Sequence, residues 1–252
     1  MGKSAVILAG GEGKRMKSDK PKALSKVLDK PMLEWVIDSV VESGIGSICV
    51  LTGFGREFID EFISEYTERT GIKIDTAFQA ERLGTGHAVM MCRDFLCKNP
   101  GDVVVLNGDA PFMDSEAISG AYEFHADNDS SATVTSAGVD DPFGYGRIIR
   151  DSNGNVAAIV EQKDTNEEQK LVNEVNSGCY WFNTEDLLSV LGELTAENAG
   201  HEYYLTDTLE LLLNKGKNVC AYKARSSNTV LGANDPEQLA RLNEIALKIV
   251  KK

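Results

Sequence analysis

The sequence predicts an α/β fold: a mostly parallel sheet with helices on both faces and a small antiparallel flap. Short apolar runs alternate with helical patterns from the N-terminus to Ala137. A glycine-rich loop follows the first apolar run, as is common where a parallel sheet binds a ligand. After Asp140 the rhythm changes to strand-like runs with short connections, which favours antiparallel pairing.

The first half of the chain alternates between the two element types. Strands are expected at short apolar, alternating or β-branched runs, namely Ser4–Leu8, Ile48–Leu51, Lys73–Ala77, Asp102–Leu106 and Ser131–Ala137. Helices are expected where apolar residues recur at helical spacing, namely Pro31–Ser43, Glu57–Thr70, His87–Leu96 and Ser115–Ala126. Strands separated by helices at this spacing imply βαβ units, whose strands run parallel.

The second half holds the flap and the terminal elements. Strand-like runs at Arg147–Arg150, Ala157–Glu161 and Val175–Phe182 suggest an antiparallel flap or extra strands beside the main sheet. Further elements are expected as a helix at Leu205–Lys215, an edge strand at Asn218–Lys223 and an amphipathic helix at Pro236–Lys252. No repeat or linker interrupts the chain. We therefore expect one main domain over residues 1–235 and a C-terminal helix over residues 236–252.

The composition is that of an ordinary globular chain with an acidic surface. Apolar residues make up 42% and charged residues 26% of the 252 positions. The net charge of −13 argues against a nucleic-acid or anionic-membrane partner, because both require a basic surface. A phosphate ligand is not excluded, since it needs only a few local cations and backbone amides.

The sequence also predicts a cytoplasmic location. No apolar run approaches the roughly 18 residues that a membrane span requires, and the N-terminus does not resemble a signal peptide. The five cysteines are odd in number and lack paired spacing, so they are expected to be buried, reduced thiols. The oligomeric state does not follow from the sequence.

The segment Leu8–Met16 follows the first predicted strand and holds three glycines between positions 10 and 13. Glycines let backbone amides approach a ligand, and clustered amides bind anions. Arg15 and Lys22 add charges that suit phosphate oxygens. The pattern is neither the dinucleotide fingerprint nor the Walker motif. A phosphate cradle and a plain tight turn both fit these residues.

The segment Gln79–Ala88 joins a predicted strand to a predicted helix. Gly84 frees the backbone, and Thr85 is a good helix N-cap. The amide of Gln79 can donate to and accept from a pyrimidine edge at once. A capped helix start without a ligand explains the segment equally well, and His87 is expected to be structural.

Asp109 directly follows a buried strand, where a carboxylate is poorly explained as a solvated surface charge. Mg²⁺ prefers one or two carboxylates together with substrate phosphates and water. Asn234, just before the last helix, offers a neutral oxygen for the same ion. A turn at Asp109 and a helix cap at Asn234 are the alternatives.

A phosphate cradle, two cations and a metal carboxylate are parts for phosphoryl or nucleotidyl transfer, which is catalysed mainly by positioning and charge stabilisation. A phosphate oxygen acting as nucleophile is already ionised near neutral pH and needs no general base. This agrees with the absence of a nucleophile elbow, a zinc-ligand spacing or an HExxH motif from the sequence.

Residues 8–24 read LAGGEGKRMKSDKPKAL and closely resemble the signature of the N-acetylglucosamine-1-phosphate uridyltransferases. Further matching blocks run in order to about residue 243, namely DKPMLEWVI, QAERLGTGHAV, LNGDAPFM, DPFGYGRIIR, IVEQKD, EVNSGCYWF, EYYLTDTLELL and LGANDPEQLARL. The resemblance is to the N-terminal domain of the bifunctional uridyltransferase/acetyltransferase of bacterial cell-wall precursor synthesis. It implies a Rossmann-like mixed sheet whose antiparallel flap lies on the sugar side.

The resemblance also implies a role for each matching residue. It implies that UTP is bound by Leu8, Ala9, Gly10, Gly11, Gln79, Gly84 and Thr85. It implies that an acetamido sugar is held by Asn107, Gly146, Glu161, Asn176 and Thr206. Arg15 and Lys22 would act in catalysis by neutralising phosphate charge. Asp109 and Asn234 fall on the two Mg²⁺-ligand positions.

The departures from the family pattern concern the sugar more than the reaction. Asn107 stands where many relatives carry an aromatic or small residue, and Ser177 replaces threonine. Arg82 replaces a common glutamine, and Asp29 a common glycine. The hexapeptide repeats of the family's acetyltransferase domain do not occur, so acetyl transfer is not expected.

The reaction implied is UTP plus N-acetylglucosamine 1-phosphate giving UDP-N-acetylglucosamine and pyrophosphate, with Mg²⁺ as cofactor. Two alternatives remain open from the sequence. One is the same transfer to another sugar 1-phosphate, such as that of glucose or N-acetylgalactosamine, or from another nucleotide. The other is a non-catalytic sensor of a UDP-sugar.

Overall fold

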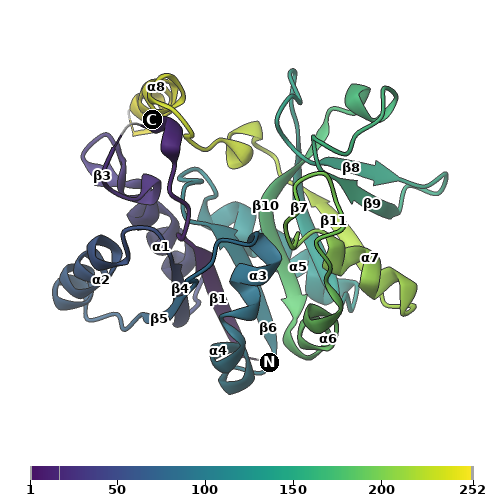
Figure 1. Cartoon of the computed structure of the whole chain (residues 1–252), viewed down its shortest axis with the longest axis horizontal. Coiled ribbons are helices and arrows are strands. Elements are labelled where there is room, and N and C mark those ends of the chain that lie inside the picture. Colours follow the sequence, from purple (N-terminus) through teal and green to yellow (C-terminus); the bar gives the residue numbers. More distant parts are fainter. Residues whose placement is uncertain (1, 17, 251–252) are drawn as a thin grey trace.

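The computed structural model describes residues 2–16 and 18–250. Within these residues nine strands form one mixed sheet, flanked by helices (Figure 1). The order across the sheet is β11-β7-β10-β6-β1-β4-β5, with β8 paired to β10 and β9 to β8. The strands are β1 (Lys3–Leu8), β4 (Ser47–Thr52), β5 (Asp75–Phe78), β6 (Asp102–Asn107), β7 (Ala132–Gly138), β8 (Arg147–Arg150), β9 (Val156–Val160), β10 (Glu174–Asn183) and β11 (Val219–Lys223).

Helices and short turns connect the strands. The helices are α1 (Met32–Glu42), α2 (Arg56–Thr70), α3 (Thr85–Met90), α4 (Arg93–Lys98), α5 (Ser115–Asp127), α6 (Thr184–Val190), α7 (Asp207–Asn214) and α8 (Pro236–Val250). The 3₁₀ turns are η1 (Lys14–Met16), η2 (Lys22–Leu24), η3 (Gln169–Leu171), η4 (Leu191–Glu193) and η5 (Ser227–Val230). A separate small ribbon pairs β2 (Lys26–Val27) with β3 (Lys30–Pro31).

The core consists of two apolar layers, one on each face of the sheet. Along β1, Val6 packs with α3, α4, α6 and α7, whereas Ala5 and Ile7 pack with α1, α2 and α5. All three side chains are fully buried. This alternation arises because successive side chains of a strand point to opposite faces. Burial on both faces explains why the central strands are continuous apolar runs. The predicted α/β architecture is confirmed.

Strand β10 corrects the predicted position of one element. The run Val175–Phe182 was expected in a flap or beside the main sheet, but β10 lies inside the sheet, antiparallel to both β6 and β7. Its side chains from Cys179 to Phe182 are buried, which suits a strand covered on both faces. The flap itself consists of β8 and β9, which pair in antiparallel fashion and join the sheet through β10 (Figure 1).

Two helical predictions are also corrected. The segment His87–Leu96 was expected as one helix, but it forms α3 and α4 with a break near Cys92, whose backbone N–H donates to Val89 O at 3.0 Å. No glycine or proline marks this break in the sequence. Helix α6 was not predicted, although Asn183 caps it by accepting a hydrogen bond from the Asp186 N–H at 3.1 Å.

Helix α8 packs back on the N-terminal part of the chain. Leu242 and Ala246 are buried in a small cluster with Val27, Met32 and Phe112. The helix was predicted to reach residue 252, but its last two predicted residues lie outside the described part of the chain. The division between residues 1–235 and residues 236–252 stays a prediction.

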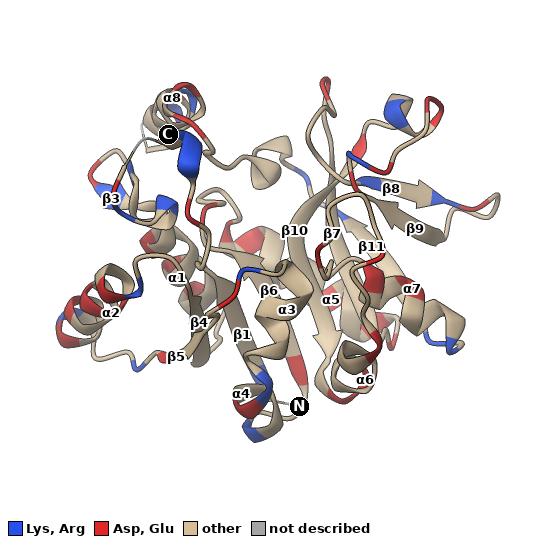
Figure 2. Ribbon diagram, in the orientation of Figure 1, with Lys and Arg blue, Asp and Glu red and all other residues tan. Residues whose placement is uncertain are grey.

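The positions of the charged residues and the cysteines agree only in part with what the sequence predicts. Asp and Glu residues occur along outer helices such as α2 and in loops (Figure 2). Cys49, Cys92 and Cys179 are buried as expected, but Cys97 is exposed on α4 and Cys220 is only half-buried. Among the described residues, no helix is both long and apolar enough to cross a membrane.

Candidate active site

A cavity with two lobes lies at the carboxyl ends of the parallel strands. The larger lobe has a volume of about 530 Å³ and reaches the flap and α8, and the smaller lobe has about 280 Å³ and reaches the loop after β5. Both are lined by Leu8, Lys22, Thr85, Asn107 and Asp109. The strand register explains why Leu8 and Asn107 lie together, because Leu8 at the end of β1 pairs with Asn107 at the end of β6. Open α/β sheets bind ligands at this edge.

The glycine loop between β1 and η1 contributes Gly10 and Gly11 to the lining of the smaller lobe. A Cβ atom on Gly53 would lie only 2.6 Å from Gly10 O, so the loop passes close to the end of β4. Gly13 has φ = 63° and a Cβ there would lie 2.5 Å from Lys22 Cβ. Gly53 and Gly13 are therefore required by close packing within the protein. Arg15 is exposed and lines the larger lobe.

Lys22 lies between the two residues that were predicted to bind a metal. Its Nζ is 2.5 Å from Asp109 Oδ2 and donates to Asn234 Oδ1 at 2.8 Å. The side chains of Lys22 and Asp109 are 20% and 18% exposed, so the pair is only partly screened by water. Asp109 is thus a site residue and not only a turn former, and it meets Asn234 from the far end of the chain.

Asn234 is held in place by the start of α8. The Asn234 N–H donates to Gln238 Oε1 at 2.8 Å, and the Gln238 N–H donates to Asp235 Oδ1 at 2.8 Å. Asp235 therefore caps the helix, which leaves the Asn234 side chain free to face Lys22. The sequence analysis missed Gln238, although Asp235-Pro236-Glu237-Gln238 carries the spacing of a capping box.

The smaller lobe presents the side-chain oxygen of Gln79. Gln79 is 6% exposed, and its Nε2 donates to Gly84 O at 3.1 Å and lies 3.0 Å from His87 Nδ1. With both Nε2 hydrogens directed inward, Oε1 remains available to the lobe. The expectation that this amide both donates to and accepts from a pyrimidine edge stays a prediction. His87 is structural as expected, and it orients Gln79.

The segment from Gly84 to Gly86, at the start of α3, packs against the chain just before α7. A Cβ on Gly84, at φ = 109°, would lie 2.6 Å from Tyr203 O. Thr85 was expected to cap the helix, but it is the first helical residue, and its hydroxyl accepts from the Leu205 N–H at 3.0 Å. The backbone of Gly84 takes the capping position without a side-chain bond.

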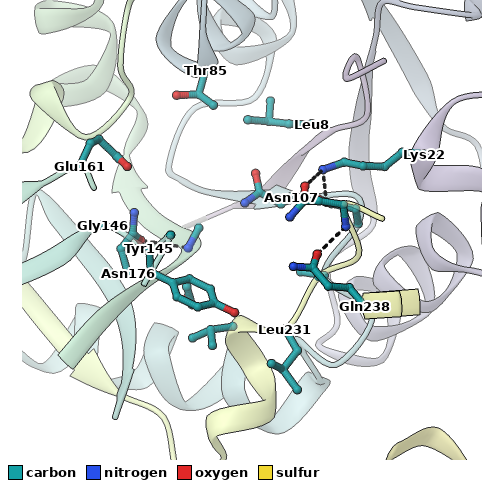
Figure 3. Close-up of a pocket in the computed structure, with 18 of the residues that line it drawn as sticks. Leu8, Lys22, Thr85, Asn107, Tyr145, Gly146, Glu161, Asn176, Leu231 and Gln238 are labelled. Carbon is teal, nitrogen blue, oxygen red and sulfur yellow. Dashed lines mark hydrogen bonds and ion pairs between the residues drawn. The ribbon is translucent and has the colours of Figure 1, made fainter. Parts of the chain in front are cut away.

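Three strands bring three predicted residues together in the larger lobe. Arg147 in β8 pairs with Val160 in β9 and with Val175 in β10. One residue beyond these pairs lie Gly146, Glu161 and Asn176, and the Asn176 N–H donates to Gly146 O at 2.9 Å. Figure 3 shows these three residues on one side of the cavity and Lys22 with Gln238 on the other.

Glu161 is a half-buried carboxylate in this row. Thr206 donates a hydrogen bond to its Oε1 at 3.3 Å. Burial raises the pKa of Glu161 above its ordinary value, the Thr206 bond opposes this, and the negative charges of Asp207, Asp164 and Glu202 raise the pKa further. The predicted residue Thr206 therefore lies in the site, in direct contact with Glu161.

A bulge in β10 aims Asn176 into the larger lobe. Between Asn176 and Cys179 the register with β7 shifts, and Gly178 adopts φ = 77°. Asn176 Nδ2 donates to Tyr180 Oη at 2.6 Å, and its Oδ1 accepts from the Gly178 N–H at 2.9 Å. A Cβ on Gly178 would collide with the amide of Asn107. The glycine therefore makes room for Asn107, another predicted residue, to line the cavity.

The structure thus brings together the predicted residues of both lobes and of the junction between them, except Ala9, which is buried in the core and lines neither lobe. Residues 4–228 match the family profile described as Nucleotidyl transferase. The chain belongs to the nucleotidyl transferase family. Family membership confirms the predicted class of chemistry, the transfer of a nucleotidyl group.

This nucleotidyl transferase has close curated relatives. It is 45% identical over 241 residues to the bifunctional protein GlmU of Acetivibrio thermocellus, across 96% of the chain and 51% of the relative. It is 46% identical over 245 residues to the bifunctional protein GlmU of Clostridium novyi, across 97% of the chain and 52% of the relative. The chain spans about half the length of these relatives, and the resemblance seen in the sequence is confirmed.

A solved structure supports the fold of this nucleotidyl transferase. A UDP-glucose pyrophosphorylase complexed with UDP-glucose superposes with a TM-score of 0.79 at 17% identity, over 98% of this chain and 99% of that chain. At this identity the likeness concerns the fold alone. It agrees with the Rossmann-like mixed sheet predicted from the sequence.

The residues at the junction of the lobes fit a divalent cation, which enzymes of this family generally use. Asp109 supplies a carboxylate and Asn234 an amide oxygen, both within reach of the Lys22 ammonium, so the place already accommodates positive charge. No cluster of three or more His, Cys, Asp or Glu residues that could hold a metal occurs within residues 2–16 and 18–250. A hard cation that takes few protein oxygens and completes its shell with phosphate and water matches this donor set.

Proposed function

We propose that this nucleotidyl transferase moves a uridylyl group from UTP to N-acetylglucosamine 1-phosphate and releases pyrophosphate. The observation that carries the proposal is the meeting of two distinct lobes at Lys22, Asp109 and Asn234. One lobe suits a nucleoside and the other a sugar, and the charged junction suits phosphates. The curated relatives named bifunctional protein GlmU support the choice of substrates.

We assign the nucleoside to the smaller lobe. There Gln79 Oε1 can accept a hydrogen bond from the N3–H of uracil, which cytosine lacks. Gly10 and Gly84 line this lobe, so their backbone can lie against the base and ribose. The residues assigned to nucleotide binding are Leu8, Ala9, Gly10, Gly11, Gln79, Gly84 and Thr85.

We assign the sugar to the larger lobe. The Glu161 carboxylate accepts hydrogen bonds from sugar hydroxyls, and the Asn176 amide meets the acetamido group or a hydroxyl. A Cβ on Gly146 would lie 3.4 Å from both Glu161 oxygens, so glycine leaves that face open to the ring. The residues assigned to sugar binding are Asn107, Gly146, Glu161, Asn176 and Thr206.

The chemistry at the junction needs no general base. A phosphate oxygen of the sugar phosphate attacks the α-phosphorus of UTP, the bond to the β-phosphate oxygen breaks, and pyrophosphate leaves. Arg15 and Lys22 stabilise the charge that develops on the phosphoryl oxygens. Mg²⁺, held by Asp109 and Asn234, would supply charge neutralisation of the phosphates.

The proposal places the enzyme in the cytoplasm. The free thiols of all five cysteines support this, because unpaired cysteines are typical of reducing compartments. The proposal covers only uridylyl transfer. It makes no assignment of the acetyl transfer that the relatives' other half would imply.

Measuring pyrophosphate release with UTP and Mg²⁺ against a panel of sugar 1-phosphates tests the function. The panel contains N-acetylglucosamine, N-acetylgalactosamine and glucose 1-phosphates, and each is also supplied with CTP, GTP and ATP. Release is expected with UTP and N-acetylglucosamine 1-phosphate. The Asp109→Ala variant is expected to remain folded and to lose turnover. Turnover with only another sugar would reassign the acceptor, and binding of UDP-N-acetylglucosamine without any release would indicate a sensor.

A further inference from the structure

Arg147 is a buried cation in β8 that does not line the cavity. It is 1% exposed and among the largest fully buried side chains. One guanidinium nitrogen donates to Tyr145 O and another to Gln162 Oε1 at 2.9 Å. Its Nε is buried without a hydrogen-bond partner, and the acceptors of its two other nitrogens are neutral oxygens rather than carboxylates.

Such a cation is not explained by stability. Removing a charge from water without an opposite partner is costly, and one unsatisfied N–H adds to the cost. Burial accordingly lowers the pKa of Arg147, and the more distant negative charge of Asp141 offsets this only in part. An apolar side chain of similar length would avoid both penalties. The contacts that the guanidinium makes are therefore what sets Arg147 apart from an apolar residue.

The contacts of Arg147 join two neighbouring segments on the flap side of the larger lobe. Tyr145 belongs to the loop before β8, and Gln162 follows Glu161 after β9. Gln162 Oε1 also accepts from the Gly144 N–H at 2.8 Å, so one amide oxygen ties the loop and the guanidinium together. These bonds set how far the backbone of the loop lies from Glu161.

The distance between this loop and Glu161 matters because little space separates them. The carboxylate of Glu161 faces the Cα of Gly146 closely enough that a Cβ would lie 3.4 Å from both of its oxygens. Tyr145 and Gly146 both line the larger lobe, as does Glu161. A loop released from Arg147 could move against Glu161 without unfolding the flap, which remains paired through β8, β9 and β10.

We infer that Arg147, acting through Gln162 and the Tyr145 carbonyl, is a positioning residue that holds the sugar-side loop at residues 143–146 in register with Glu161 and so governs binding of the sugar phosphate. The inference rests on the proposed function for the identity of that ligand. It assigns Arg147 no contact with substrate.

Steady-state kinetics with three variants test the inference. Arg147→Met and Gln162→Leu are expected to raise the KM for the sugar 1-phosphate about tenfold, the scale of one lost positioning bond, and to leave the KM for UTP within about twofold. Gln162→Glu keeps an acceptor for both Gly144 and Arg147, so it is expected to retain the normal KM. A sugar-phosphate KM that is unchanged in both Arg147→Met and Gln162→Leu would overturn the inference.

Arg150→Met is the matched control on the same strand. Arg150 binds Glu174 through two nitrogens at 2.6 and 2.9 Å, and this bond raises the pKa of Arg150. The control is therefore expected to lower the Tm and leave both KM values unchanged. Arg147→Met is expected to leave the Tm about unchanged and to raise only the KM for the sugar phosphate. If Arg147→Met lowers the Tm and raises both KM values together, Arg147 is structural and the inference fails.

Hydrogen exchange separates this inference from the proposed function. In the free protein, Arg147→Met and Gln162→Leu are expected to speed exchange of the Gly144 and Tyr145 amides at least tenfold and to leave the β8 amides protected. If the unaltered protein releases no pyrophosphate with any sugar phosphate, the proposed function fails, and the exchange rates alone then decide the inference. Unchanged exchange at residues 143–146 would overturn it.

Discussion

At the scale of single residues, Lys22 and a metal ion would compete for the same side-chain oxygens at the junction of the two lobes. Lys22 occupies the position between Asp109 and Asn234 that a shared cation would take. The ammonium lies 2.5 Å and 2.8 Å from these two oxygens, so it would compete with a metal ion for them. A phosphate arriving with the ion offers Lys22 a new partner. We therefore expect the metal to bind well only together with the nucleotide.

The Lys22→Met variant tests this competition. Without the ammonium, Asp109 and Asn234 are free, and one positive charge is removed. Mn²⁺, used as a spectroscopic probe, is expected to bind the nucleotide-free variant at least about tenfold more tightly, while turnover falls by about a hundredfold or more. Electron paramagnetic resonance titration measures the binding. Equal Mn²⁺ affinity in the variant and the unaltered protein would contradict the competition.

Glu161 gives the proposed sugar site a pH dependence with a definite sign. Its pKa is raised mainly by burial, so the carboxylate gains a proton at a pH where an exposed glutamate would still be ionised. The protonated form accepts fewer hydrogen bonds from sugar hydroxyls. The KM for the sugar phosphate is therefore expected to rise as the pH falls through mildly acidic values, while the KM for UTP changes less.

Glu161→Gln is the control for this pH effect. The variant is expected to bind the sugar phosphate weakly at every pH, with a flat profile in place of the acidic rise. A profile that keeps the same acidic rise in Glu161→Gln would show that another group titrates.

At the scale of elements, bulges and helix starts set the directions of the site residues. Gly178 at the β10 bulge has φ = 77°, and a Cβ there would strike Asn107. Gly178→Ala is expected to lower the free energy of unfolding by about 1–3 kcal/mol. It is also expected to raise the KM for the sugar phosphate, because Asn107 and Asn176 both move. Chemical denaturation checks the first effect, and Gly192→Ala, where the added Cβ meets open space, is the control.

Two helix starts provide stability predictions of opposite sign. At the start of α7, burial and then the charges of Glu210 and Asp164 raise the pKa of Asp207 from 3.8 to about 6. A carboxyl group with a raised folded pKa destabilises the fold above that pKa, and the penalty vanishes as the pH falls to the unfolded value. Asp207→Asn is expected to raise the Tm above pH about 7 and to have little effect below pH about 4.

Asp186 at the start of α6 provides the contrast. Burial alone would raise its pKa, but hydrogen bonds from Lys217 and Ser131 outweigh burial and lower it. Its contribution is present above the unfolded pKa and is lost as the pH falls through the lowered folded value. Asp186→Asn is therefore expected to lower the Tm at neutral pH. Equal Tm shifts in the two variants would contradict this assignment of the two carboxylates.

The elements also show where sequence reasoning reached its limit. Apolar runs and helical spacing located the strands of the parallel half because each is buried on both faces. The position of β10 inside the sheet could not be read from local pattern, since it depends on pairing with β6 and β7, far away in the chain. The break between α3 and α4 carries no glycine or proline, so the local sequence does not predict it.

At the scale of the whole molecule, the cavity joins residues from both ends of the chain. Motif order was enough to predict that Asp109 and Asn234 serve one site, and the structure places both against Lys22. Residues that act through others, such as Gln238 and Arg147, could not be found in the same way. Their roles depend on hydrogen bonds to backbone atoms, which leave no chemical signature in the sequence.

In the proposed function the two substrates occupy two lobes that share the lining residues Lys22 and Asp109, and this arrangement is the central claim. Its most direct test is the initial rate of pyrophosphate release with UTP and Mg²⁺, measured with and without N-acetylglucosamine 1-phosphate. Release that requires the sugar phosphate, yields UDP-N-acetylglucosamine in equal amount and disappears in Asp109→Ala is the expected result. Release that is independent of any sugar phosphate, or full activity in Asp109→Ala, would contradict the claim.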